Sequence, residues 1–274
     1  MNRLFKKNLP LLSFLFMLTS CVNLAAGNGV SVVNYISADV EYENADRQER
    51  VVQTFSSVRN QGPLDVIFTG GNECSVTLSG DSRYFDKVNT RVSDGELVIS
   101  LERGKYRNLK MRVLVTCPDI RSLTVQGSGD MECRSDLISD RPLSIRVHGS
   151  GDIDVLTVEC SELDASVSGS GDLDIDRLNT ASADLTVNGS GDLEIGRLET
   201  VTANMTVHGS GDLSVEKAVI LGGMSAKVQG SGDISVNGQA KEISASVMGS
   251  GDISGDMKYE KLTKERAGSG SVRL

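Results

Sequence analysis

The tetrapeptide Gly-Ser-Gly-Asp recurs through the second half of this chain, and that repeat limits what the chain can fold into. Its seven copies begin at Gly127, Gly149, Gly169, Gly189, Gly209, Gly230 and Gly249. A variant, Gly-Ser-Gly-Ser, begins at Gly268, and successive starts lie 22, 20, 20, 20, 21, 19 and 19 residues apart. A nearly constant interval of this length is typical of a repeat architecture, in which each unit packs mainly on its neighbours.

Apolar residues alternate with polar ones on both sides of each tetrapeptide. The residue two positions before the first glycine is always valine: Val125, Val147, Val167, Val187, Val207, Val228 and Val247. The residue after the aspartate is Met131, Ile153, Leu173, Leu193, Leu213, Ile234 or Ile253. Two residues further on stand Cys133, Val155, Ile175, Ile195, Val215 and Val236, then Gly255. A period of two predicts half-buried strands that meet at a glycine turn.

A unit of about 20 residues is too short to hold paired hairpins with a core of their own. It fits one coil of a solenoid in which coils stack about 4.8 Å apart and equivalent side chains form interior columns. Helical periodicity is absent from the sequence after the N-terminal segment. We therefore predict an all-β fold, a single-chain parallel β-helix or β-solenoid with coils of about 20 residues.

The region upstream of the repeats resembles a less regular version of the same unit. The segment from Val58 to Val66 keeps a valine, a glycine and two apolar positions at matching offsets, and the segment from Val92 to Ile99 is similar with one residue fewer. We expect one solenoid domain over residues 51–267 with less regular N-terminal coils. Residues 21–50 are expected to be a tether and capping segment, and residues 268–274 a C-terminal tail.

The N-terminus has the layout of a secretory signal. Arg3, Lys6 and Lys7 precede a short apolar stretch, and Leu18-Thr-Ser-Cys21 resembles the lipobox of bacterial lipoproteins. We predict that residues 1–20 are removed, that Cys21 is lipidated, and that acyl chains hold the protein on a membrane. No acidic cluster follows Cys21, which favours an outer-membrane lipoprotein on the periplasmic face over one on the cell surface.

The repeated aspartates admit two interpretations. Glycine accepts the backbone angles of a sharp corner, and Ser and Asp side chains can hydrogen bond to turn amides. Alternatively, the aspartates form a ladder that binds cations such as Ca²⁺, because stacked carboxylates repel one another and need compensation. The ladder would comprise Asp130, Asp152, Asp172, Asp192, Asp212, Asp233 and Asp252.

Composition argues against several other functions. A net charge of −9 gives no basis for nucleic-acid binding. The two histidines precede glycine corners that are three coils apart, and there is no CxxC motif. The sequence therefore predicts neither a transition-metal site nor a catalytic triad. No aromatic residue lies between residues 107 and 258 to stack on a sugar. We predict no catalytic residues and no metal site, and no cofactor unless the aspartate ladder binds calcium. Cys133 is expected to be a buried apolar residue, and the sequence does not define any cysteine pairing.

Residues 55–255 resemble the family described as "putative auto-transporter adhesin, head GIN domain", which is common in Bacteroidetes. The resemblance rests on Phe55-Ser-Ser-Val58, Gly62-Pro-Leu-Asp-Val66, Val92-Ser-Asp-Gly-Glu-Leu97 and the Gly-Ser-Gly-Asp series. It implies an all-β, solenoid-like envelope protein, often behind a lipoprotein signal, and it supplies no catalytic residues. This chain departs from the family pattern at Gly62-Pro63, where Gly-Asp is usual.

These observations lead to one main functional hypothesis and two alternatives. The main hypothesis is a non-enzymatic, lipid-anchored envelope module that binds an unknown envelope or surface partner, as an adhesin does. The first alternative is a structural envelope protein that self-associates into a homo-oligomer. The second is a calcium-dependent β-solenoid module.

Overall fold

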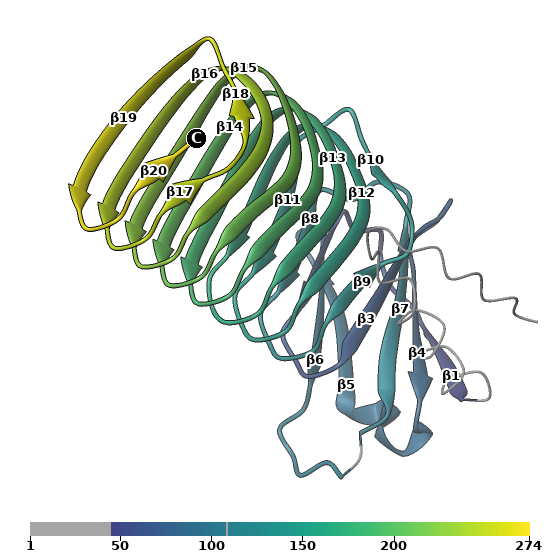
Figure 1. Ribbon diagram of the computed structural model, residues 1–274. Helices are drawn as coiled ribbons and strands as arrows, with labels where there is room; N and C mark the ends of the chain where they lie inside the picture. Colours follow the sequence, from purple (N-terminus) through teal and green to yellow (C-terminus); the bar gives the residue numbers. More distant parts are fainter. Residues whose placement is uncertain (1–44, 108) are drawn as a thin grey trace, which may run out of the picture. The chain divides into compact units, whose positions relative to one another are not determined.

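The computed structural model describes residues 45–107 and 109–274, which form a parallel β-solenoid of about eight turns with coils about 20 residues apart (Figure 1). Strand accounts for 66% of the structure and helix for 3%, so the predicted fold class is confirmed. No helix among the described residues has the length and apolar character needed to cross a membrane. The predicted signal peptide and the lipid-attachment residue Cys21 lie outside the described residues.

Each regular coil is a single bent strand that contributes to three faces. The five longest are β12 (Ile153–Val167), β13 (Leu173–Gly189), β14 (Leu193–Gly209), β15 (Leu213–Gly230) and β16 (Ile234–Gly249). They pair in parallel with equivalent residues opposite one another. In β13 the pairing runs over residues 173–175, 177–180 and 182–189 with a gap at each bend. We call the three stacked surfaces the first, middle and last faces.

The predicted interior columns are present. All seven valines of the valine column are fully buried, as are all seven apolar residues that follow the aspartates. The next column, from Cys133 to Val236, is at most 4% exposed, which also confirms Cys133 as a buried apolar residue. Each Val, Leu or Ile removed from water contributes about 1.5–3 kcal/mol, so this continuous core stabilises the stack of coils.

The N-terminal layers are not wound in chain order. The first coil comprises β2 (Ser57–Asn60) and β3 (Asp65–Gly70), on which β8 (Ser122–Val125) and β9 (Met131–Cys133) stack in parallel. Between them the chain makes an excursion through β4 (Ser75–Gly80), the short 3₁₀ helix η1 (Ser82–Lys87), β5 (Val88–Ser93), β6 (Glu96–Leu101) and β7 (Met111–Cys117).

The excursion adds layers to the other side of the first coil. β6 and β7 pair in parallel with β2 and β3, whereas β4 and β5 pair antiparallel with β7 and β6. β1 (Asp46–Arg50) then pairs antiparallel with β4. In Figure 1 these strands, purple to blue, occupy one end of the stack and β19 and β20 the other. The chain enters the regular coils through β10 (Leu137–Ile138) and β11 (Leu143–Val147).

Two sequence-based alignments of the N-terminal region are wrong. Asn60, not Val58, stands opposite Val125, so the segment aligns with the repeat two residues later than predicted. A shift of two residues keeps every side chain on the same face of a strand, so the alternation could not reveal it. The segment from Val92 to Ile99 is no coil corner: Asp94 and Gly95, both with positive φ, form the two-residue turn of a hairpin.

The sheet extends beyond both predicted domain boundaries. β1 lies before residue 51 and is part of the sheet. At the C-terminus, β17 (Ile253–Ser254), β18 (Met257–Lys258), β19 (Lys261–Gly268) and β20 (Val272–Arg273) complete the last layers. Residues 268–274 are therefore part of the final coil rather than a separate tail, because β20 pairs in parallel with β17.

Candidate functional site

Each Gly-Ser-Gly-Asp corner stacks on the corner of the preceding coil through backbone hydrogen bonds. The carbonyl oxygen of Gly149 accepts from the amides of Ser170 (2.9 Å) and Gly171 (3.2 Å) in the next coil, and this pair of bonds recurs up to Gly270. These bonds satisfy amides that a sharp corner would otherwise leave without partners. The tetrapeptide is therefore part of the scaffold that holds the coils together.

The corner glycines are required by the close approach of successive backbones. A Cβ atom on Gly191 would lie 2.0 Å from the carbonyl oxygen of Gly171, and one on Gly169 would lie 2.2 Å from that of Gly149. Both distances are far inside van der Waals contact, and the obstructing atom belongs to the backbone. Any side chain at these positions would force the coils apart.

The seven repeated aspartates form a continuous ladder along the corner. Each donates its backbone N–H to Oδ1 of the equivalent aspartate in the preceding coil, with N···O distances of 2.7–3.3 Å. The first acceptor is Asp65, and the last carboxylate, that of Asp252, accepts from both the amide and the hydroxyl of Ser271. Backbone N–H groups thus donate to one oxygen of each carboxylate, which offsets part of the repulsion between the stacked negative charges.

A second acidic row runs parallel to this ladder on the first face. Two residues after the ladder aspartates stand Glu132, Asp154, Asp174 and Glu194, and the next three coils carry Ser214, Ser235 and Ser254 there. Four consecutive coils therefore present two carboxylates each. We call this surface the acidic face.

The carboxylates of the acidic face interact unfavourably with one another. Burial, followed by the charges of Asp152 and Asp130, raises the pKa of Asp154 to about 6. Burial, together with the charges of Asp154 and Glu194, raises the pKa of Asp174 to about 6. Both shifts have the sign expected when a carboxylate is moved out of water toward other negative charges.

Among the described residues, basic side chains form ion pairs with the ladder and the second acidic row only at the two ends of the array. Arg134 pairs with Glu132 at 2.8 Å, and Arg273 pairs with Asp252 at 2.7 Å. Between these two pairs, no carboxylate of either row forms an ion pair within residues 45–107 and 109–274. The three consecutive coils that carry both rows there contribute six of these carboxylates: Asp152, Asp154, Asp172, Asp174, Asp192 and Glu194. These three consecutive coils leave negative charge available to a partner.

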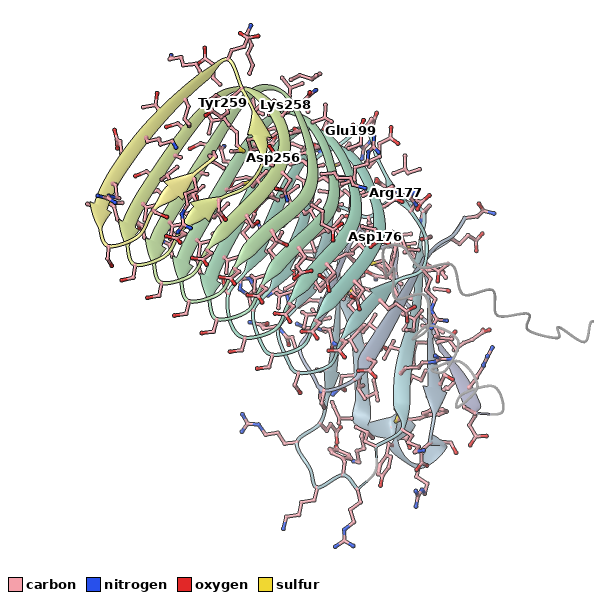
Figure 2. All side chains as sticks on the ribbon, viewed as in Figure 1. Asp176, Arg177, Glu199, Asp256, Lys258 and Tyr259 are labelled. Carbon is pink, nitrogen blue, oxygen red and sulfur yellow. The ribbon has the colours of Figure 1, made fainter. Side chains whose placement is uncertain are left out.

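The middle face has a different, mixed character. Figure 2 labels Asp176, Arg177 and Glu199 on or beside it, with Asp256, Lys258 and Tyr259 on the last coil. Acidic side chains lie beside a basic column formed by Arg177, Arg197 and Lys217 in three consecutive coils, and Arg197 donates to Glu199 at 2.8 Å. An ion pair between exposed side chains is typical of a solvated surface, and this face carries charges of both signs.

The other candidate groups are scattered. His148 and His208 are exposed on the last face, three coils apart. No group of three or more His, Cys, Asp or Glu in the described part of the chain is placed to hold a metal ion. A small hollow of about 40 Å³, partly open to solvent, lies between β3, the end of β7 and β10, and most of the residues that line it are apolar. Asp136 is the one carboxylate in that lining, so the hollow lacks paired groups for acid–base chemistry.

Comparison with known proteins establishes the family. Residues 54–221, more than half of the chain, match the family described as "Putative auto-transporter adhesin, head GIN domain". The chain belongs to this family, as the sequence motifs predict. No curated protein matches the chain.

Several crystal structures share the fold. A protein described as a "putative adhesin" from Parabacteroides distasonis superposes with a TM-score of 0.73 at 22% identity, covering 84% of this chain and 96% of that one. One of the same description from Parabacteroides merdae gives 0.73 at 17% identity, with the same coverage. A "putative lipid binding protein" from Parabacteroides distasonis gives 0.71 at 22% identity, again with the same coverage.

Sequence reasoning missed two features of the site. Asp65, the first acceptor of the ladder, follows Leu64 rather than glycine, so the tetrapeptide pattern could not identify it. The second acidic row was visible as the Gly-Asp-x-Asp/Glu spacing in four consecutive coils. Each residue of this row stands between two buried apolar positions and two residues after a ladder aspartate. In a strand, that spacing places its side chain on the same face as the ladder.

Proposed function

We propose that this protein is a non-enzymatic, lipid-anchored module of the bacterial cell envelope that binds a basic partner through its acidic face. The observation that carries the proposal is the two parallel rows of carboxylates, six in three consecutive coils, that form no ion pair with any described residue. Membership of a family described as adhesins supports a role in attachment. The regular stacking provides a long, rigid surface suited to extended contact.

The charge on the acidic face can be removed without touching the corner ladder. Asp154, Asp174 and Glu194 take no part in the backbone hydrogen bonds of the corners. The triple variant Asp154→Asn, Asp174→Asn, Glu194→Gln removes three charges and preserves side-chain size. A matched control is Ser214→Ala, Ser235→Ala, Ser254→Ala, which changes the same row in the next three coils.

Binding to an isolated envelope fraction then tests the proposal. We expect the wild-type chain and the serine control to capture the same partner, with capture weakened at high salt because the contact is electrostatic. The triple variant should lose at least tenfold in apparent affinity. Equal capture by the two triple variants would show that the acidic face does not bind the partner.

The proposed lipid anchor has a separate test. Cells that produce the full chain are given a labelled fatty acid, and the label should enter the wild-type protein but not the Cys21→Ala variant. Cys133→Ala serves as the control, because this cysteine lies in the solenoid core. We propose that the anchored protein lies at the outer membrane and faces the periplasm. Protease added to intact cells reports the side, because it should leave a periplasmic protein uncut and cleave one on the cell surface.

The alternative function, a structural protein that self-associates through the ends of its solenoid, is disfavoured by the residues of the last coil. Lys264 and Arg266 stand opposite Ala245 and Val247, so charged residues occupy the interior columns of the terminal strand. Inward-facing charges on an edge strand prevent another sheet from adding to it. Replacing both, as Lys264→Ala with Arg266→Val, should produce concentration-dependent oligomers in light scattering. Lys261→Ala is the control, and oligomers already present in the wild type would favour the structural alternative.

Calcium dependence is a second proposal, favoured by the mutual repulsion within the acidic face. A divalent cation would relieve the interaction that raises the pKa of Asp154 and Asp174. Binding would raise the melting temperature on addition of Ca²⁺ and lower it again with EDTA. An unchanged melting temperature would exclude this form of the function.

A further inference from the structure

Two cysteine thiols approach each other at the base of the N-terminal excursion. β4 and β7 are antiparallel neighbours with Ser75 opposite Thr116, so Cys74 and Cys117 are the next facing pair along the two strands. Their Sγ atoms lie 2.8 Å apart, well inside the distance at which two unbonded sulfur atoms rest. Facing residues of adjacent antiparallel strands have the Cα separation that a disulfide requires.

The surroundings of the pair favour one specific partnership. Both Sγ atoms point at the same backbone carbonyl, that of Phe55, at 2.9 Å from Cys117 and 3.4 Å from Cys74. Cys133 and Cys160, in contrast, are buried in separate columns, on the first and middle faces. Cys160 contacts Thr180 at 3.7 Å. The described cysteines therefore comprise one facing pair and two separate thiols.

We propose that Cys74 and Cys117 form an intramolecular disulfide when the protein meets a disulfide donor, such as a thiol–disulfide oxidoreductase or oxidised glutathione. The Cys74 thiolate attacks one donor sulfur, forming a mixed disulfide and releasing a donor thiolate. The Cys117 thiolate then attacks Sγ of Cys74, which forms the new bond and releases the second donor thiolate. The two cysteine protons end on the two donor thiols, so the donor is reduced by the two electrons that the protein loses.

The accessibility of the two thiols orders these steps. Cys74 is partly exposed and Cys117 is buried, so the donor reaches Cys74 first and Cys117 resolves the mixed disulfide. Burial, together with its contact to Cys74, raises the pKa of Cys117 to about 12. Because the thiolate is the nucleophile, closure in the folded protein should accelerate as the pH rises.

The bond would fasten the least regular part of the solenoid. It joins residues 43 positions apart and encloses β4, η1, β5, β6 and most of β7. These elements make up the outer layers that cover the first coil. A cross-link over so long a segment restricts the unfolded chain strongly. The excursion would then cap the N-terminal end of the core without depending on packing alone.

Peptide mapping of the purified chain tests the pairing. The reduced protein is treated with oxidised glutathione, free thiols are alkylated in denaturant, and the digest is analysed by mass spectrometry. We expect a linked peptide pair containing Cys74 and Cys117, lighter by two hydrogens than the sum of its parts, with Cys133 and Cys160 alkylated. Alkylated Cys74 and Cys117 after this treatment, or a link to another cysteine, would overturn the proposal.

Thermal unfolding gives a second, independent readout. The oxidised protein should melt about 5–15 °C higher than the reduced protein, given typical disulfide energies for a domain of this size. This difference should vanish in Cys74→Ser and persist in Cys160→Ser. A redox-dependent shift that persists in Cys74→Ser would contradict the assignment.

The same mapping on envelope fractions separates this inference from the proposed location. A linked pair in cells is expected if the chain is exported to an oxidising compartment, as the proposed function requires. Free thiols in cells, with closure by glutathione in the purified protein, would uphold the pairing and count against the location.

Discussion

The regular coils and the N-terminal layers build the same stack by different means. From β12 to β16 the order of strands in space is their order in the chain, and each corner is held by glycine backbones in close contact. In the N-terminal layers the chain forms the outermost strand β1 first and then the first coil, β2 and β3. It next runs outward to β4 and β5 and returns through β6 and β7 before it reaches β8. The larger side chains Phe55, Phe68 and Phe85 fill the core there. In the regular half, the same backbone contacts and the same side-chain columns recur in every coil, whereas the N-terminal layers depend on individual side chains.

Asn60 shows how one side chain replaces a corner. It occupies the place of the column valine, and the chain then continues as Gln-Gly-Pro-Leu-Asp instead of x-Gly-Ser-Gly-Asp. Its Nδ2 donates to the carbonyl oxygens of Leu64 (2.7 Å) and Gly129 (3.2 Å), and its Oδ1 accepts from the amide of Gly62. The fully buried side chain of Asn60 thus supplies hydrogen-bond partners to backbone groups of a corner that lacks the Gly-Ser-Gly sequence.

The sharpest way to break the regular half is to add one methyl group to a corner. Gly191→Ala places Cβ 2.0 Å from a backbone oxygen that cannot move without disturbing the coil below. We expect a loss of about 3 kcal/mol or more in the free energy of unfolding, measured by denaturant titration.

Gly223→Ala is the matched control for this effect. Gly223 lies in the same array, at the irregularity in β15, and an added Cβ would have no heavy atom within 4 Å. Its stability should change by less than about 0.5 kcal/mol. Similar losses in the two variants would show that the corners tolerate side chains and that glycine there reflects something other than close stacking.

Restoring the repeat consensus in the irregular half should also destabilise the protein. Asn60→Val reproduces the residue of the other seven coils, yet it leaves the Gly62 amide and the Leu64 carbonyl without their buried partner. We expect a loss of about 2 kcal/mol in the free energy of unfolding. Gln61→Val on the exposed neighbouring position is the control and should change stability little. A more stable Asn60→Val protein would show that the column sets stability there, not the amide.

The sequence was sufficient to predict the columns, because seven valines at a fixed interval leave few other arrangements. It could not order the N-terminal layers, since the alternation of apolar residues is unchanged by a slip of two residues. Asp94-Gly95 did carry a hairpin signal, but the neighbouring valine and leucine also fitted the coil pattern. The facing of Cys74 and Cys117 depends on an antiparallel pair that only the folded excursion defines.

The acidic face of the regular half should destabilise the protein in a pH-dependent way. The pKa of Asp154 is raised to about 6 in the folded state, against about 4 in an unfolded chain. The folded state therefore holds the proton more tightly, so the free energy of unfolding should fall as the pH rises from about 4 to 6 and level off above that. Asp154→Asn removes this effect and should stabilise the protein at pH 8 by about 1 kcal/mol, after allowance for solvent screening.

The pH dependence of that gain distinguishes charge repulsion from packing. At pH 4 the wild-type carboxyl is largely neutral in the folded state and about half neutral in the unfolded chain, so the unfolding free energies of the wild type and the variant should approach each other. Ser214→Ala, in the same row and without a titratable group, should give an offset that is the same at pH 4 and pH 8. If Asp154→Asn also showed a constant offset, its effect would come from hydrogen bonding or packing, and the acidic face would not be a source of strain. If the two unfolding free energies approach each other at low pH, repulsion between carboxylates destabilises the regular half at neutral pH. That repulsion would lie on the surface where the proposed partner binds.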